Sequence, residues 1–207
     1  MLPTPLYLDD ALIAVDKPAG LLAVPGRGPD KSDCLWARVR ACWPDALVVH
    51  RLDMATSGLM LFARGLAVQR LLSQAFAERR VDKRYIAVVD GHPTAHEGRI
   101  DLPLAADWPR RPLQRVDPEA GRPARTDWQR LAQHAHSARL ALQPHTGRTH
   151  QLRLHLAAIG HPILGDALYA PPEVQARAPR LLLHAEALTL PHPSTGARLQ
   201  LRCPAPF

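Results

Sequence analysis

Apolar and polar positions alternate over short stretches along most of the chain. Residues 6–16 predict two short strands around an Asp-Asp turn, and residues 17–20, which include a proline and a glycine, end the second strand. Residues 21–24 predict another short strand. Two further apolar runs, 48–52 and 59–63, predict a pair of buried strands that a polar turn joins.

Three segments have apolar residues at helical spacing. Residues 33–43 predict a helix capped by Ser32-Asp33, residues 66–79 have the clearest helical pattern, and residues 148–159 predict a helix ended by Gly160. Residues rich in β-formers predict further strands at 84–89, 139–142, 180–190 and 199–202. The pattern as a whole predicts an α+β fold.

Residues 91–125 have a different character, because glycine and proline recur too often for a helix. We expect loops and a short ribbon there. Within residues 110–125, five arginines face one aspartate and one glutamate, so the net charge of this stretch is +3. A solvated loop is the ordinary interpretation of such a charge run.

Composition narrows the class of protein. The chain has 207 residues, enough for one large domain or two packed halves, and its net charge of +7 fits a polyanionic partner. It has no run of about 20 apolar residues that could span a membrane, and no secretory signal at the start, so we expect a cytoplasmic protein. The three cysteines include no metal-binding spacing, so we expect no metal.

The junction of the two central apolar runs holds the most informative residues. Asp53 follows one run directly and lies beside His50 and Arg51. A carboxylate in this position is either part of a structural ion pair or a nucleophile. If it is buried, it needs a cation nearby to stay ionised. The residues alone leave both interpretations open.

Three motifs carry a resemblance to a known family. Residues 50–58, His-Arg-Leu-Asp-Met-Ala-Thr-Ser-Gly, are similar without a gap to the catalytic motif of the RluA-type pseudouridine synthases. Lys83-Arg84-Tyr85 resembles the family's K-x-Y segment. Residues 146–155 resemble its third motif, and residues 160–166 continue the same pattern.

The resemblance runs from about Leu6 to the last residues. Residues 107–112 and 178–186 resemble those members of the family that act on both ribosomal RNA and tRNA. The resemblance implies a pseudouridine synthase fold, with a mixed, mostly antiparallel sheet in two adjoining halves, outer helices and a central catalytic cleft. We expect residues 1–207 to form a single catalytic domain with no S4 domain.

The resemblance also implies a reaction and its residues. The enzyme would isomerise specific uridines in structured RNA, using an aspartate nucleophile and base flipping, and would need no cofactor. Asp53 would be the catalytic carboxylate, Tyr85 would lie against the uracil and help remove its proton, and Arg153 would pair with Asp53. The expected substrates are a stem-loop of 23S ribosomal RNA and the anticodon stem-loop of tRNA.

Five arginines are candidates for RNA binding. Arg51 could fill the gap that an extruded base leaves, although a plain salt bridge is nearly as good an interpretation. Arg148 could grip phosphate or cap a loop. In a protein with this resemblance, the basic stretch at 110–125 is a candidate RNA-gripping arm, with Arg110, Arg111 and Arg115 as its contacts. We expect a monomer that does not bind membranes.

Three alternatives stay open on the sequence. The chain could be a synthase for a single ribosomal RNA substrate. It could be a non-catalytic RNA-binding protein descended from such an enzyme, although Asp53, Tyr85 and Arg153 are all present. It could also be a glycosylase, which would release free uracil and leave an abasic site.

Overall fold

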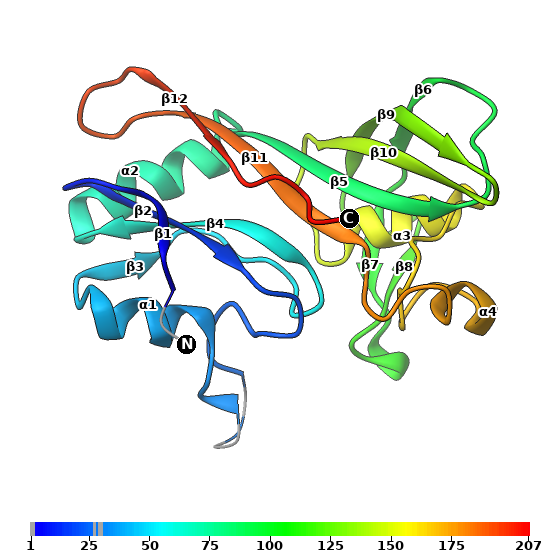
Figure 1. Cartoon of the computed structure of the whole chain (residues 1–207), viewed down its shortest axis with the longest axis horizontal. Helices are drawn as coiled ribbons and strands as arrows, with labels where there is room; N and C mark the ends of the chain where they lie inside the picture. Colours follow the sequence, from blue (N-terminus) through cyan, green and yellow to red (C-terminus); the bar gives the residue numbers. More distant parts are fainter. Residues whose placement is uncertain (1–2, 27, 29–30) are drawn as a thin grey trace. The chain divides into compact units, whose positions relative to one another are not determined.

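The chain divides into two compact units. The computed structural model describes residues 3–26, 28 and 31–207. The first unit comprises Met1–Lys83 and His184–Pro206, and the second comprises Arg84–Leu183 together with Phe207. Each unit has antiparallel strands and helices of its own (Figure 1).

The first unit is built on a mixed sheet. Its strands follow the order β1-β2-β4-β11, while β3 also pairs with β4 and β12 also pairs with β11. The pairing of β4 with β11 is parallel, and the other pairings are antiparallel. The strands are β1 (Pro5–Leu8), β2 (Leu12–Lys17), β3 (Ala46–Val48), β4 (Ser57–Arg64), β11 (Leu183–Pro191) and β12 (Arg198–Arg202).

Strand β4 is apolar along nearly its whole length because both of its faces are covered. Helix α2 (Leu66–Ala77) packs on β4, and α1 (Leu35–Cys42) packs on β3. The two helices lie on opposite sides of these strands (Figure 1). Side chains alternate between the faces of a strand, so Leu59 and Leu61 join the α2 core while Met60 and Phe62 are buried on the other face.

The second unit has a four-stranded antiparallel sheet in the order β5-β10-β9-β6, and a separate two-stranded ribbon, β7-β8. The turn Trp108–Arg110 lies between the two ribbon strands. The elements are β5 (Asp82–Asp90), β6 (Glu97–Asp101), β7 (Leu104–Ala106), β8 (Gln114–Val116), β9 (Arg125–His134), β10 (Ser137–Pro144), α3 (Gln151–Ala158) and α4 (Pro172–Gln175).

The predicted α+β class with a mixed, mostly antiparallel sheet is confirmed, and so are the short ribbon and the helix near residues 66–79. Two predicted strands are wrong. Residues 21–24 form only an isolated bridge, from Leu22 to Cys34. The strand expected at 48–52 is instead β3, which ends at Val48. Residues 49–52 leave the sheet because the His50 side chain bonds to the backbone of β4.

Two helices begin later than the sequence predicts. The cap of α1 is Cys34 rather than Ser32-Asp33, and its Sγ accepts a hydrogen bond from the Ala37 amide. Helix α3 begins at Gln151 because His150 adopts a left-handed conformation, with φ of 54°. The largest omission is β9, ten residues long, which has no counterpart among the predicted strands.

Candidate active site

Asp53 lies on a tight turn just before β4. The Thr56 amide donates to the Asp53 carbonyl at 3.1 Å, which closes the turn. Asp53 is partly exposed, and the next residue, Met54, is 53% exposed. Leu52 is buried on the other side of Asp53 and anchors the turn to the first unit. The Asp53 carboxylate therefore lies at the surface, and the backbone that bears it is anchored by buried Leu52.

Lys17 supports this turn. Its side chain is fully buried, and its ammonium donates to the carbonyls of Pro18 and Leu21 at 2.8 Å and to that of Met54 at 3.0 Å. Burial lowers the pKa of Lys17 from 10.5 to about 8, and the carboxylates of Asp53 and Asp16 oppose that shift. At neutral pH the lysine is therefore mostly protonated, and its positive charge attracts the Asp53 carboxylate.

His50, three residues before Asp53, has a structural role. Its Nε2 accepts a hydrogen bond from the Leu61 amide at 2.9 Å, and its ring stacks on Phe76 with 4.8 Å between centroids. Burial, assisted by the charge of Lys83, lowers the pKa of His50 to about 4. The imidazole is thus neutral at physiological pH and is engaged with β4.

Gly58 shows why the motif ends in glycine. Its φ is +112°, a conformation that side chains rarely adopt, and a Cβ at this position would overlap the backbone of Ala185. The close approach comes from the parallel pairing of β4 with β11, in which Ala185 is the partner of Gly58. The glycine therefore lets β11 lie directly beside the end of the Asp53 turn.

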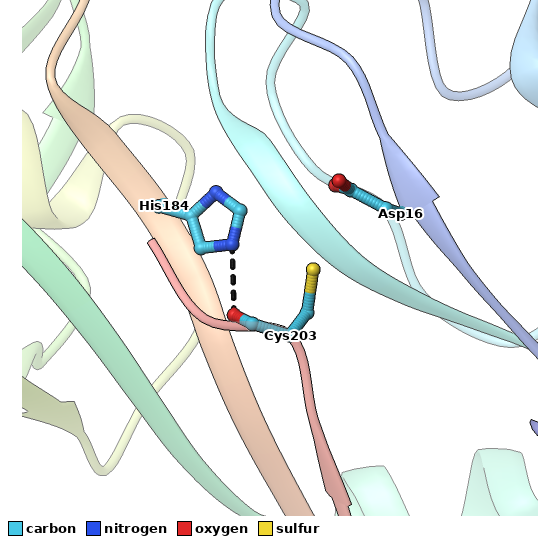
Figure 2. A group of neighbouring side chains, drawn as sticks. All are labelled: Asp16, His184 and Cys203. Carbon is cyan, nitrogen blue, oxygen red and sulfur yellow. Dashed lines mark hydrogen bonds between the residues drawn. The ribbon is translucent and has the colours of Figure 1, made fainter. Parts of the chain in front are cut away.

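Among the described residues, one group of side chains has metal-ligand chemistry: Asp16, His184 and Cys203 (Figure 2). Both ring nitrogens of His184 are engaged, Nδ1 with Ser57 Oγ at 2.9 Å and Nε2 with the Cys203 carbonyl at 2.9 Å. Burial and Asp16 raise the pKa of the Cys203 thiol to about 12. A protonated thiol and a fully bonded imidazole are poor ligands, so this group serves to join β11 and β12 to Ser57.

The second unit carries Tyr85 and Arg153. Tyr85 lies on β5, opposite Leu142 of β10, and is partly exposed, whereas the next residue, Ile86, is fully buried. Strand alternation thus points Tyr85 away from the face that buries Ile86. The phenol is held on a regular strand and is not part of a closed core.

Arg153 is buried in α3 and forms a two-pronged ion pair. Its Nε and Nη2 bond to the Asp166 carboxylate at 2.9 and 2.5 Å, and the exposed fractions of the two side chains are 4% and 0%. Asp166 also accepts the amides of Leu168 and Tyr169. A pair with these bonds fixes the guanidinium in one orientation. The resemblance predicts Asp53 as the partner of Arg153 and does not predict these bonds to Asp166.

The rest of the third motif is a hydrogen-bond network that holds the start of α3. Gln151 is central to it: its carbonyl oxygen accepts from Thr146 Oγ1 at 2.7 Å and from the Arg148 amide at 3.0 Å. Its amide nitrogen donates to Thr126 and to the Arg125 carbonyl on β9. Farther along α3, buried His155 bonds to Thr126 and to the Leu102 carbonyl. The motif thus attaches α3 to the sheet.

Asp53 and Arg153 belong to different units, so their pairing stays a prediction. The catalytic roles assigned to Asp53, Tyr85 and Arg153 also stay predictions. Two supporting residues were missed: Lys17 under Asp53, and Asp166 as the partner of Arg153. Lys17 begins the segment predicted to end the second strand, and Asp166 ends the segment that continues the third motif. A lysine directly after five apolar residues and an acid is the signal that could have identified Lys17.

The five candidate RNA-binding arginines differ in their surroundings. Arg51 is exposed, and Arg148 donates from Nε to the Pro123 carbonyl at 3.1 Å. Arg110 pairs with Asp107 at 2.6 Å and Arg115 pairs with Asp117 at 2.7 Å. The remaining candidate is Arg111, whose guanidinium lies over the Trp108 ring at 3.5 Å from its centroid. Two arginines of the arm at 110–125 are therefore already paired with acids.

Comparison with known proteins identifies the class. A family model described as RNA pseudouridylate synthase matches residues 11–158. The chain belongs to this family and is an RNA-modifying enzyme that converts uridine to pseudouridine. The non-catalytic and glycosylase alternatives are set aside by this assignment.

Individual relatives agree with the class over nearly the whole chain. The dual-specificity RNA pseudouridine synthase RluA of Escherichia coli (strain K12) is 51% identical over 98% of this chain and 93% of its own length. The protein of the same name from Yersinia pestis is 49% identical over 98% of each chain. The structure of human RNA Pseudouridylate Synthase Domain Containing 1 superposes with a TM-score of 0.82, at 28% identity, over 100% of this chain and 87% of that one.

No helix in the described part of the chain has the length and apolar character to cross a membrane.

Proposed function

We propose that this enzyme modifies uridines in two kinds of RNA, a stem-loop of 23S ribosomal RNA and the anticodon stem-loop of tRNA, with Asp53 as its catalytic residue. The observation that carries the assignment of Asp53 is its turn, which presents a partly exposed carboxylate above the buried ammonium of Lys17. The relatives of about 50% identity named for dual specificity support the choice of two RNAs.

The reaction breaks the bond between uracil N1 and ribose C1′, and forms a bond between uracil C5 and the same carbon. Asp53 attacks the sugar or stabilises the intermediate as an anion, which requires it to be ionised. The positive charge of Lys17 attracts this carboxylate from within the first unit. Arg153 pairs with Asp53 and maintains its charge, and Tyr85 helps remove the proton from C5 after the new bond has formed. No redox step occurs, so no cofactor or metal is needed.

Binding rests on phosphate contacts and on extrusion of the target base. Flipping a nucleotide costs about a few kcal/mol, and less for a base in a loop than for a paired one. Arg51, exposed beside the Asp53 turn, fills the space that the base leaves. Arg148, Arg110, Arg111 and Arg115 contact the RNA outside the turn. The protein acts as a cytoplasmic monomer with one catalytic domain.

The test is pseudouridine formation by the purified protein on two synthetic RNAs, an anticodon stem-loop and a 23S hairpin. We expect Asp53→Asn and Asp53→Ala to reduce the single-turnover rate at least about a thousandfold, since the reaction then lacks its nucleophile. Asp10→Asn, which changes an exposed acid of the same unit, is the matched control. Wild-type rates in both Asp53 variants would overturn the assignment.

The same assay separates the remaining candidate substrates. Modification of both RNAs supports dual specificity, and modification of the ribosomal hairpin alone identifies a single-substrate synthase. Chromatography of the products adds a check on the chemistry, because isomerisation retains the base on the RNA and releases no free uracil.

A further inference from the structure

The turn between β7 and β8 exposes an aromatic side chain. Trp108 is 67% exposed, whereas Trp128 is 9% exposed and the two remaining tryptophans are partly buried. An indole left in water forgoes a large hydrophobic gain. One face of the Trp108 ring is covered by the Arg111 guanidinium, at 3.5 Å. The exposed fraction leaves the other face open to a flat partner.

Arg111 differs from the neighbouring arginines in its charge environment. Arg110 and Arg115 are each bonded to an aspartate, Asp107 and Asp117. Within the part of the chain that the structure describes, no acid pairs with Arg111. Its positive charge is therefore both exposed and stacked on an aromatic ring, the combination with which proteins bind unpaired bases beside phosphates.

The turn that carries Trp108 is rigidly held. Asp107 is 5% exposed, and its carboxylate accepts from Arg110 Nε at 2.8 Å. The Leu113 amide donates to the Arg110 carbonyl, and the Asp107 amide donates to the Leu113 carbonyl, both at 3.0 Å. The indole is thus presented by a preorganised turn, which reduces the entropy lost on binding.

The ribbon is also tied to the surroundings of Arg153. The Gln114 amide of β8 donates to the Tyr169 hydroxyl at 2.9 Å. The ring of Tyr169 lies 5.3 Å from the guanidinium carbon of Arg153, and its amide bonds to Asp166. Within the second unit, the position of the Trp108 turn is therefore set relative to Arg153.

We propose that Trp108 and Arg111 form a binding site for one unpaired nucleobase of the substrate RNA, with the base stacked on the indole and Arg111 contacting the adjoining phosphate. The proposal rests on the proposed function, since it assumes a stem-loop RNA substrate. It adds a site outside the three motifs at residues 50–58, 83–85 and 146–155, at which the turn would recognise an unpaired nucleotide of a loop. Stacking is tolerant of base identity, so the site selects an unpaired nucleotide without selecting its sequence.

The test measures the affinity of the full-length protein for a synthetic anticodon-type hairpin and for a fully paired duplex of equal length. We expect Trp108→Ala and Trp108→Leu to weaken hairpin binding about tenfold or more, the effect of losing one stacked base. Trp108→Phe should stay within about threefold because it keeps an aromatic face. Leu131→Ala, which trims another exposed apolar side chain, is the control.

A second measurement locates the base. Hairpins that carry an abasic nucleotide at each loop position in turn are bound to wild-type protein and to Trp108→Ala. At one position the abasic RNA should bind wild-type protein as weakly as the intact RNA binds the variant, with no further loss when the two changes are combined. Additive losses at every position would overturn the proposal.

Two further results would also overturn it. One is equal affinity of Trp108→Ala and wild type for the hairpin, which would leave the exposed indole to a protein partner. The other is an equal loss on the paired duplex, which would show that Trp108 contacts the RNA backbone. Failure here is distinct from failure of the proposed function, because wild-type pseudouridine formation and its dependence on Asp53 are measured independently.

Discussion

The two units support their candidate catalytic charges in different ways. In the first unit, buried Lys17 bonds to three backbone carbonyls, one of them that of Met54, directly after Asp53. In the second unit, buried Asp166 bonds to the side chain of Arg153 itself. Each unit thus buries a charge opposite to that of its candidate residue. The lysine fixes the backbone that bears the acid, and the aspartate fixes the arginine side chain.

This difference matches the separate proposed tasks of the two residues. An arginine that serves to hold a partner in place benefits from a fixed orientation. A carboxylate that attacks a sugar must stay at the surface, so its support acts on the main chain and through the field of Lys17. Since a buried ion pair contributes little net stability, we interpret Asp166 as a residue that positions Arg153. Lys17, which bonds to backbone carbonyls, likewise positions the Asp53 turn.

Replacing Arg153 should destabilise the protein more than any other change considered. Arg153→Met leaves the Asp166 carboxylate buried beside an apolar side chain, so we expect the free energy of unfolding to fall by about 3–5 kcal/mol. Urea denaturation would measure this change, with Arg70→Met at an exposed position of α2 as the control. Adding Asp166→Asn should restore much of the stability without restoring activity. A double variant no more stable than the single one would contradict the role given to Asp166.

Lys17 gives the next largest effect. Lys17→Met keeps the length of the side chain but removes the donor to the carbonyls of Pro18, Leu21 and Met54. We expect a loss of about 2–3 kcal/mol in unfolding free energy and slower isomerisation, because the Asp53 turn loses its support. Lys31→Met, at an exposed position, provides the comparison. Unchanged stability and rate would mean that the turn is held by other contacts.

His50 provides a smaller, pH-dependent test. Its pKa falls from 6.5 in the unfolded chain to about 4 in the folded one, so between these values the unfolded chain binds the extra proton. Stability should therefore decrease as pH falls from 6.5 to 4, by at most about 3 kcal/mol from this residue. Thermal melts of His50→Gln across this range should show a shallower decrease. Parallel curves of stability against pH for the variant and the wild type would contradict this role of His50.

Much of the fold could be predicted because strong patterns mark it. The apolar run of β4 and the helical spacing of α2 reflect burial against neighbouring elements, and both were found. Strand β9 was missed because several of its residues are exposed and its sequence is mixed, with polar residues at most positions. The strand expected at 48–52 was wrong because a tertiary bond from His50 draws that segment out of the sheet.

Within the candidate site, only the residues of the sequence motifs could be predicted. Asp53, Tyr85 and Arg153 were selected by resemblance. The supports under them depend on contacts between segments far apart in sequence, such as Lys17 with the Met54 carbonyl. The pairing of Arg110 with Asp107 likewise reduces the free charge that composition suggested for the arm. Charge counts along a sequence do not show which charges are already neutralised.

The most direct measurement maps pseudouridines in the total RNA of cells that lack the gene and carry either the wild-type chain or Asp53→Asn. We expect the wild-type chain to restore modification at one loop uridine in 23S RNA and one in a tRNA anticodon arm. Asp53→Asn, expressed at an equal level, should restore neither. Restoration of both sites by Asp53→Asn would show that this carboxylate does not perform the reaction.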